Sequence, residues 1–154
     1  MDKLQNPIQI IGIELRTTND LGRSFVDIPL FWQRFLKKNC ATHIQNKLNN
    51  DLYAVYTRFE NEGKNNQGMY SLIIGCPVKS NTTAATGFTT IAIPAGSYLV
   101  FPVEGGRRNK VGEAWQSIWS MADSEKRTWR FSCDFERYRT SGEIDIFIGI
   151  KDHK

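Results

Sequence analysis

Two carboxylates and a phenol recur at every second position near the end of the chain. They are Asp134, Glu136 and Tyr138, within the segment Arg130-Phe-Ser-Cys-Asp-Phe-Glu-Arg-Tyr-Arg139. Aromatic or apolar residues alternate with polar ones along this segment, which predicts a β-strand with these three residues on one face. The alternate residues, predicted to face the core, are Phe131, Cys133 and Phe135.

Glu136 is the candidate functional residue of this strand. Its neighbourhood in the sequence is rich in rings, with Trp115, Trp119 and Trp129 before it and Phe147 after it. A carboxylate near so much apolar surface is either solvated at a sheet edge and paired with a nearby Arg or Lys, or enclosed in a pocket. In a pocket it would be the counter-charge of a cationic aromatic ligand. With a raised pKa it would instead be a general acid or base.

The elements that position these residues form two similar series. The first half predicts a strand over 5–18 and strands over 52–60 and 69–78. Between them it predicts a helix from 24 or 27 to about 49, with Asp27 as a plausible N-cap, a candidate interruption at Lys37-Lys38-Asn39 and a candidate separate turn over 44–48. The second half predicts strands over 88–93 and 97–104, a helix over 110–121, a loop over 123–127, and strands over 130–139 and 143–151. Each half therefore runs strand, helix, strand, hairpin, strand.

This repeat of arrangement predicts an α+β fold in a single domain spanning 1–154. It would consist of two β-α-β-β modules, about 5–79 and 87–151, in a pseudo-twofold arrangement with antiparallel sheets. Neither module would bury a sheet face alone, so the two should pair. Clefts at such interfaces commonly bind small ligands, and we expect a central ligand cleft here.

Composition narrows the function classes. The chain has 154 residues, a net charge of +4 and a pI of about 9.0. That charge permits weak phosphate affinity but is no nucleic-acid signature, and the densest basic group, Arg107-Arg-Asn-Lys110, precedes a predicted helix. The N-terminus lacks a signal-peptide pattern and no apolar run has the length of a membrane span, so a cytoplasmic protein is expected. The three cysteines and two histidines lack metal-ligand spacing, and neither a metal site nor a cofactor is expected.

Several segments together resemble the GyrI-like family, which includes the effector-binding domains of AraC-type and MerR-type multidrug transcription regulators. In chain order they are Asp51-Leu-Tyr-Ala-Val-Tyr56, Tyr70-Ser-Leu-Ile-Ile-Gly-Cys-Pro-Val78, Ile93-Pro-Ala-Gly-Ser-Tyr-Leu-Val-Phe101, the helix with Trp115 and Trp119, Asp134-Phe-Glu-Arg-Tyr138, and Ile144-Asp-Ile-Phe-Ile-Gly-Ile-Lys151. The resemblance implies paired modules, also called SHS2 modules, around a cleft that binds lipophilic, often cationic, aromatic compounds.

The resemblance also implies positions for the site. The family's acidic pocket residue falls on Glu136, and an aromatic of the last strand, usually Tyr in an Ile-Tyr-Ile-Pro run, falls on Phe147, with Gly149 at the Pro position. The helix aromatics correspond to Trp32 and to Trp115 or Trp119, each of which also has the spacing of a core residue. The remaining candidate ligand-binding residues are the strand tyrosines Tyr56, Tyr70 and Tyr138, whose hydroxyls need partners when buried.

Three functions remain open on this basis. The leading expectation is a standalone protein that binds a small lipophilic or cationic compound, either as a relative of transcription regulators or to sequester a toxin. Few residues precede the first predicted strand, so no helix-turn-helix and no direct DNA binding are expected, and neither is a membrane partner. The second is a hydrolase of strained, cyclopropane-type toxins that uses Glu136 as its catalytic residue. The third is a gyrase-inhibitor-like module that acts on a protein partner.

Overall fold

One antiparallel sheet of eight strands forms the body of the protein, in the order β1-β6-β8-β7-β3-β4-β2-β5. The computed structural model describes residues 2–152. Its strands are β1 (Asp2–Leu4), β2 (Ile8–Thr18), β3 (Leu52–Thr57), β4 (Met69–Val78), β5 (Thr89–Ile93), β6 (Gly96–Pro102), β7 (Trp129–Tyr138) and β8 (Ile144–Ile150). Its helices are α1 (Arg23–Lys37), α2 (Val111–Trp119) and the short α3 (Asp123–Lys126).

The predicted repeat is present in the order of the elements. β2, α1, β3 and β4 follow one another in the first half, and β6, α2, β7 and β8 follow one another in the second. In each half the third strand lies between the other two, and the halves join where β3 pairs with β7. The α+β class is therefore confirmed, but the two halves share one continuous sheet instead of forming separate sheets.

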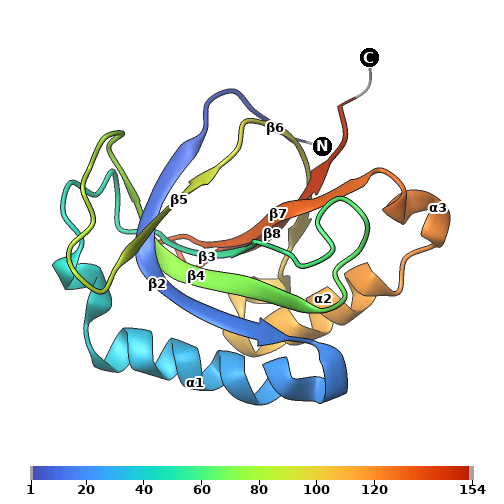
Figure 1. The fold of residues 1–154 in the computed structure, drawn as a ribbon, viewed down its shortest axis with the longest axis horizontal. Helices are drawn as coiled ribbons and strands as arrows, with labels where there is room; N and C mark the ends of the chain where they lie inside the picture. The colour runs from blue at the N-terminus through green and yellow to red at the C-terminus, as the bar shows by residue number, and fades with distance from the viewer. Residues whose placement is uncertain (1, 153–154) are drawn as a thin grey trace.

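The sheet is strongly curled (Figure 1). Gly12 of β2 pairs with Gly75 of β4 in an unbroken register. A Cβ on Gly12 would lie 2.0 Å from the carbonyl oxygen of Ile74, and one on Gly75 would lie 2.1 Å from that of Ile11. Only glycine permits strands to approach this closely, and the pair allows β2 and β4 to coil tightly.

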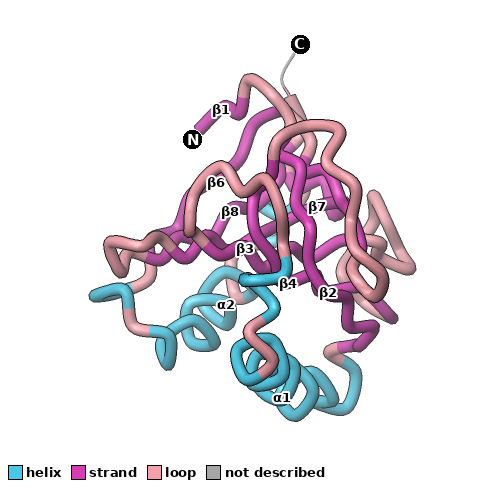
Figure 2. The backbone as a smooth tube through the Cα atoms, turned by 90° about the vertical axis from the view of Figure 1, so that its left-hand side faces the viewer, coloured by secondary structure: helices cyan, strands magenta, loops and turns pink. Residues whose placement is uncertain are grey.

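Both long helices lie on the same side of the sheet (Figures 1 and 2). The core between helices and sheet includes Phe31 and Phe35 of α1, Trp115 and Ile118 of α2, and Ile146 of β8. A second core fills the other face of the curled sheet and contains residues such as Val55, Tyr98 and Phe135. The two cores give the two faces of β7 different environments, as the sequence pattern predicts.

Local details differ from the sequence predictions at the ends of elements. Helix α1 begins at Arg23 after Gly22, so Asp27 lies inside the helix, where it accepts a hydrogen bond from Thr17. The helix ends at Lys37, at the candidate interruption, because Asn39 has a left-handed φ of 50°, and residues 40–43 form a separate 3-10 turn. The predicted loop over 123–127 contains α3.

Phe131 lies on the face of β7 opposite to the one that the alternation predicts. The pairing of β7 with β8 is irregular between Trp129 and Asp134, and Phe131 has a positive φ of 51°. Its ring consequently packs beside Trp129, at 5.9 Å between centroids, against the core that lies under the helices. No helix among the described residues is long and apolar enough to span a membrane.

Candidate functional site

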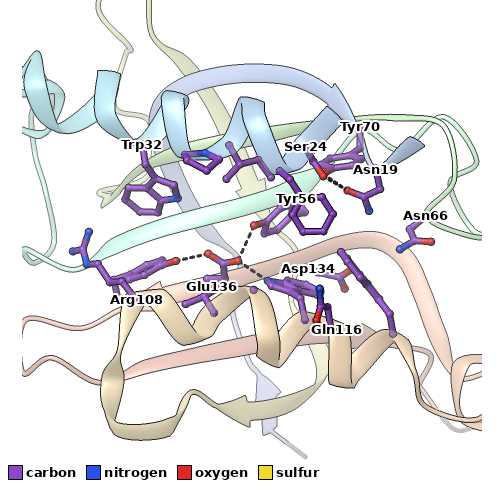
Figure 3. Close-up of a pocket in the computed structure, with 18 of the residues that line it drawn as sticks. Asn19, Ser24, Trp32, Tyr56, Asn66, Tyr70, Arg108, Gln116, Asp134 and Glu136 are labelled. Atoms are coloured by element: carbon purple, nitrogen blue, oxygen red, sulfur yellow. Dashed lines mark hydrogen bonds between the residues drawn. The ribbon is translucent and has the colours of Figure 1, made fainter. Parts of the chain in front are cut away.

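A cavity of about 510 Å³ lies between α1, α2 and strands β3 and β7 (Figure 3). We call it the Glu136 pocket. Its walls are mostly aromatic, with Trp32 from α1, Trp115 and Trp119 from α2, and Tyr56 from β3. Helix α1 covers one side and α2 the other, so the pocket occupies the space that the repeat of strand and helix leaves between the two halves.

Glu136 lies at the base of this pocket and is 1% exposed. Its Oε2 atom accepts hydrogen bonds from the hydroxyl of Tyr56 at 2.7 Å and from the indole nitrogen of Trp115 at 2.6 Å. Its Oε1 atom accepts one from the hydroxyl of Tyr138 at 2.5 Å. The donors come from β3, α2 and β7, so both halves of the fold hold the carboxylate in place.

The three hydrogen bonds favour the ionised form of Glu136. Burial raises the pKa of this carboxyl, and the bonds from Tyr138, Tyr56 and Trp115 act in the opposite direction. An indole N–H can only donate, and burial keeps the pKa values of both tyrosines well above the ordinary value, so all three groups remain protonated donors. No ion pair in the described part of the chain involves Glu136. On balance the pKa of Glu136 stays above its ordinary value, because burial outweighs the three bonds. Glu136 is therefore a buried carboxyl group whose hydrogen-bond partners are all neutral donors.

The rings around Glu136 are arranged mainly edge to face. Trp32 meets Tyr138 at a centroid distance of 4.9 Å, and Tyr56 meets Trp115 at 5.2 Å. Trp119 extends this wall from Trp115, at 5.4 Å. Such a lining offers ring faces, on which a flat apolar or cationic group gains cation–π and dispersion energy.

Seven of the eight predicted site residues line the pocket. They are Glu136, Trp32, Tyr56, Tyr70, Trp115, Trp119 and Tyr138. Tyr70 lies at the end away from Arg108, where its hydroxyl donates to Asn19 at 2.7 Å, and the hydroxyl of Ser24 donates to the same oxygen at 2.8 Å (Figure 3).

Phe147 is the exception, and its predicted place beside Glu136 is wrong. In the β7–β8 pair, the residue opposite Glu136 is Ile146, while Phe147 lies opposite Phe135. The rings of Phe147 and Phe135 stack with centroids 4.4 Å apart and planes 7° apart, in the core of the other face. Cross-strand partners share a face, so Phe147 faces away from the pocket.

Two charged residues of the pocket were absent from the predicted site. The guanidinium of Arg108 lies 5.2 Å from the ring centroid of Tyr138 and 5.6 Å from that of Trp32. The second is Asp134, whose pKa is raised to about 7 because it is desolvated, against the effects of the Gly149 N–H and of Arg130. Its position in the strand was a usable signal, since Asp134 has the same parity as Glu136. For Arg108, only membership of the basic group over 107–110 pointed to a role.

Comparisons with known proteins identify the family and the fold. The model of the Cass2 family, described as integron-associated effector binding protein, matches residues 4–150. A search of curated proteins finds no match.

Three solved structures share the fold. An integron cassette protein from the mobile metagenome of Vibrio cholerae is 20% identical, with a TM-score of 0.69 over 96% of this chain and 93% of that one. A putative bacterial transcription regulation protein from Staphylococcus aureus MU50 is 17% identical, with a TM-score of 0.74 over 97% and 96%. SAV2435 bound to tetraphenylphosphonium is 15% identical, with a TM-score of 0.69 over 98% and 94%.

Proposed function

This chain belongs to the Cass2 family of integron-associated effector-binding proteins, and on that premise we propose that it binds lipophilic aromatic cations in the Glu136 pocket. The observation that carries the proposal is the buried carboxylate itself. Glu136 has three neutral donors and no ion-pair partner among the described residues, at the base of a cavity lined with rings.

The energetics of a buried charge explain why a cation is the ligand of choice. Removing a carboxylate from water costs several kcal/mol, which three hydrogen bonds offset in part. A cation that enters the pocket brings the missing opposite charge, at a dielectric constant lower than that of water. A neutral ligand of the same shape gains only the contact with the rings. The tetraphenylphosphonium bound by the structural neighbour SAV2435 is a compound of the proposed class.

The proposed role is that of an effector-binding protein related to transcription regulators. The family description and the putative regulation protein of the same fold support it. Sequestration of a toxic compound requires the same binding step, so both roles depend on the chemistry of Glu136.

A titration with matched ligands tests the binding. Tetraphenylphosphonium is the cation, and triphenylphosphine oxide is a neutral compound with similar rings, and both are followed by quenching of tryptophan fluorescence. We expect Glu136→Gln to weaken binding of the cation about 30-fold or more, an effect of roughly 2 kcal/mol. Binding of the neutral compound should change less than about threefold, because the rings remain.

The control is Glu125→Gln, which removes the same charge from an exposed position on α3. It should leave both affinities unchanged. Equal weakening of both ligands by Glu136→Gln would reject the anchor role. The hydrolase alternative stays a prediction, and mass spectrometry of an electrophilic cyclopropane compound after incubation tests it. If the wild-type protein consumes the compound and Glu136→Gln does not, the protein is a hydrolase and not only a binding protein.

A further inference from the structure

A second carboxylate lies in the Glu136 pocket. Asp134 is two residues before Glu136 on β7, with the same parity, and both line the cavity. Residues i and i+2 of a strand are about 7 Å apart along its direction, so the two acidic groups are separated by about the length of two fused or linked rings. Phe135 between them points into the opposite core.

Asp134 is held by the backbone of β8. Its Oδ1 atom accepts a hydrogen bond from the N–H of Gly149 at 2.9 Å, next to the irregular stretch where the β7–β8 register is interrupted. Its Oδ2 atom has no hydrogen-bond partner among the described residues. The positive charge of Arg130 acts on the pKa of Asp134, but its guanidinium lies over Tyr98, at 4.7 Å from the ring centroid, and forms no ion pair with Asp134 in the described chain.

The charged side chains of the pocket lie one after another along the direction of β7. Arg108 lies against Tyr138 at one end, Glu136 comes next, and Asp134 lies further toward the end with Gln116 and Asn66 (Figure 3). A cation at Glu136 therefore has a positive neighbour on one side and a carboxylate on the other. The side with Asp134 is the one on which a second positive charge is stabilised. Tyr56, which lies opposite Asp134 in the β3–β7 register, supplies a ring beside that position.

We propose that the Glu136 pocket is selective for flat aromatic dications, with one positive group held by Glu136 and the second by Asp134. This inference rests on the proposed function and names its ligand class more narrowly. With a single anchoring carboxylate, a second positive charge on the ligand adds no affinity. With two carboxylates on one strand face, a ligand whose two charges match their separation binds more tightly. Asp134 is then the residue that determines specificity.

Two probes with the same frame test this directly. The dication is 1,1′-dimethyl-4,4′-bipyridinium, and the monocation is N-methyl-4-phenylpyridinium, which keeps the two rings and one charge. We expect Asp134→Asn to weaken binding of the dication about tenfold and binding of the monocation less than about twofold. The amide oxygen of asparagine can still accept the Gly149 N–H, so β8 should stay in place. Asp123→Asn, at an exposed position on α3, is the charge-matched control and should change neither affinity.

The outcomes separate the inference from the function on which it rests. Suppose that Glu136→Gln weakens binding of both probes, while Asp134→Asn either leaves both affinities unchanged or lowers them equally. The proposed dication site is then wrong, and the proposed cation site at Glu136 stands. If Glu136→Gln weakens neither probe, the proposed function fails as well.

A second readout needs no variant. The charged and titratable groups whose pKa values are linked to Asp134 are Arg130 and Cys133 on its own strand and Tyr98 on β6. Glu136 lies two residues further along β7, and Tyr56 lies opposite Asp134 on β3. Asp134 gains its charge as the pH rises through a pKa of about 7, so the preference for the dication over the monocation should increase about fivefold between pH 6 and pH 8. Titration of Glu136 affects both probes and cancels in the ratio. A ratio that is constant with pH would overturn the role of Asp134.

Discussion

The two faces of β7 contain similar rings but differ in what those rings do. On one face, Phe135 contacts Phe147, Tyr53 and Tyr98, and the rings fill the space inside the curled sheet. On the other face, Tyr138 and the rings of Tyr56 and Trp115 direct their polar atoms to Glu136 and enclose a cavity of about 510 Å³. Consecutive residues of one strand therefore belong to a filled core and to an open site.

The difference lies in where the polar atoms of the rings find their partners and not in the number of rings. On the filled face the hydroxyl of Tyr98 donates to the carbonyl oxygen of Pro94, whereas the pocket rings donate to one shared carboxylate. Phenyl rings have no polar atom to satisfy, so they stack and exclude everything else, as Phe135 and Phe147 do. Tyrosine and tryptophan must place a hydroxyl or an N–H on a partner when buried. A single carboxylate that receives three such groups fixes the rings at its periphery, and the rings cannot then collapse on one another.

Phe135→Ala should have the largest effect that this comparison predicts. Phe135 is 2% exposed and packs against three rings, and removal of such a side chain costs about 3–5 kcal/mol of unfolding free energy. Denaturant unfolding measures this loss. The side chain points away from the pocket, so the milder Phe135→Leu, which retains more stability, should bind tetraphenylphosphonium within about twofold of wild type. A large loss of affinity in folded Phe135→Leu would show that the two faces are not independent.

The sequence predicted the aromatic rings and the acidic residue of the pocket face, but not Arg108 or Asp134. Alternation along β7 placed Glu136 and Tyr138 together, the helical spacing of Trp115 and Trp119 placed them toward the sheet, and the repeat placed a cleft between the halves. The GyrI-like resemblance, which the match to the effector-binding family confirms, assigned the acidic position to Glu136. These features depend on local periodicity, which the chain carries in its own residue order.

What could not be predicted depends on pairing between strands. The face on which Phe147 lies follows from its register with Phe135. That register is set by the hairpin between β7 and β8 and not by the residues of β8 alone. Phe131 changes face because the register slips between Trp129 and Asp134. The same irregular stretch leaves the N–H of Gly149 free to bind Asp134. The Ile-Tyr-Ile-Pro run of the GyrI-like resemblance has a proline at the position of Gly149, and a proline has no N–H to donate. Register and irregularities of this kind are tertiary features.

Tyr138→Phe should have an intermediate effect, confined to the pocket face. The substitution removes one of the three donors that lower the pKa of Glu136, so that pKa rises further and less of the carboxylate is ionised at a given pH. Binding of a cation is lost as the pH falls through this pKa. The midpoint of that loss should therefore move to higher pH, and affinity near neutral pH should fall about fivefold, or roughly 1 kcal/mol. Titrations with tetraphenylphosphonium at a series of pH values measure both changes.

Tyr70→Phe is the matched control for this prediction. The hydroxyl of Tyr70 lines the same pocket but donates to Asn19, not to Glu136. Its removal should leave the midpoint where it is in the wild-type protein. Equal shifts in the two variants would mean that loss of any pocket hydroxyl perturbs Glu136, and the role of the direct hydrogen bond would be lost.

Arg108→Gln should have the smallest effect and the opposite sign. The guanidinium lies over the rings of Tyr138 and Trp32, where it occupies ring faces that a cationic ligand would use and repels that ligand. Because Arg108 is exposed, solvent screens the repulsion, and the expected gain in affinity for tetraphenylphosphonium is about threefold or less. Arg107→Gln, which removes the same charge from the adjacent exposed residue, should give no comparable gain. Weaker binding by Arg108→Gln would mean that the arginine supports the rings of the pocket, and that a ligand cation binds beside it without displacing it.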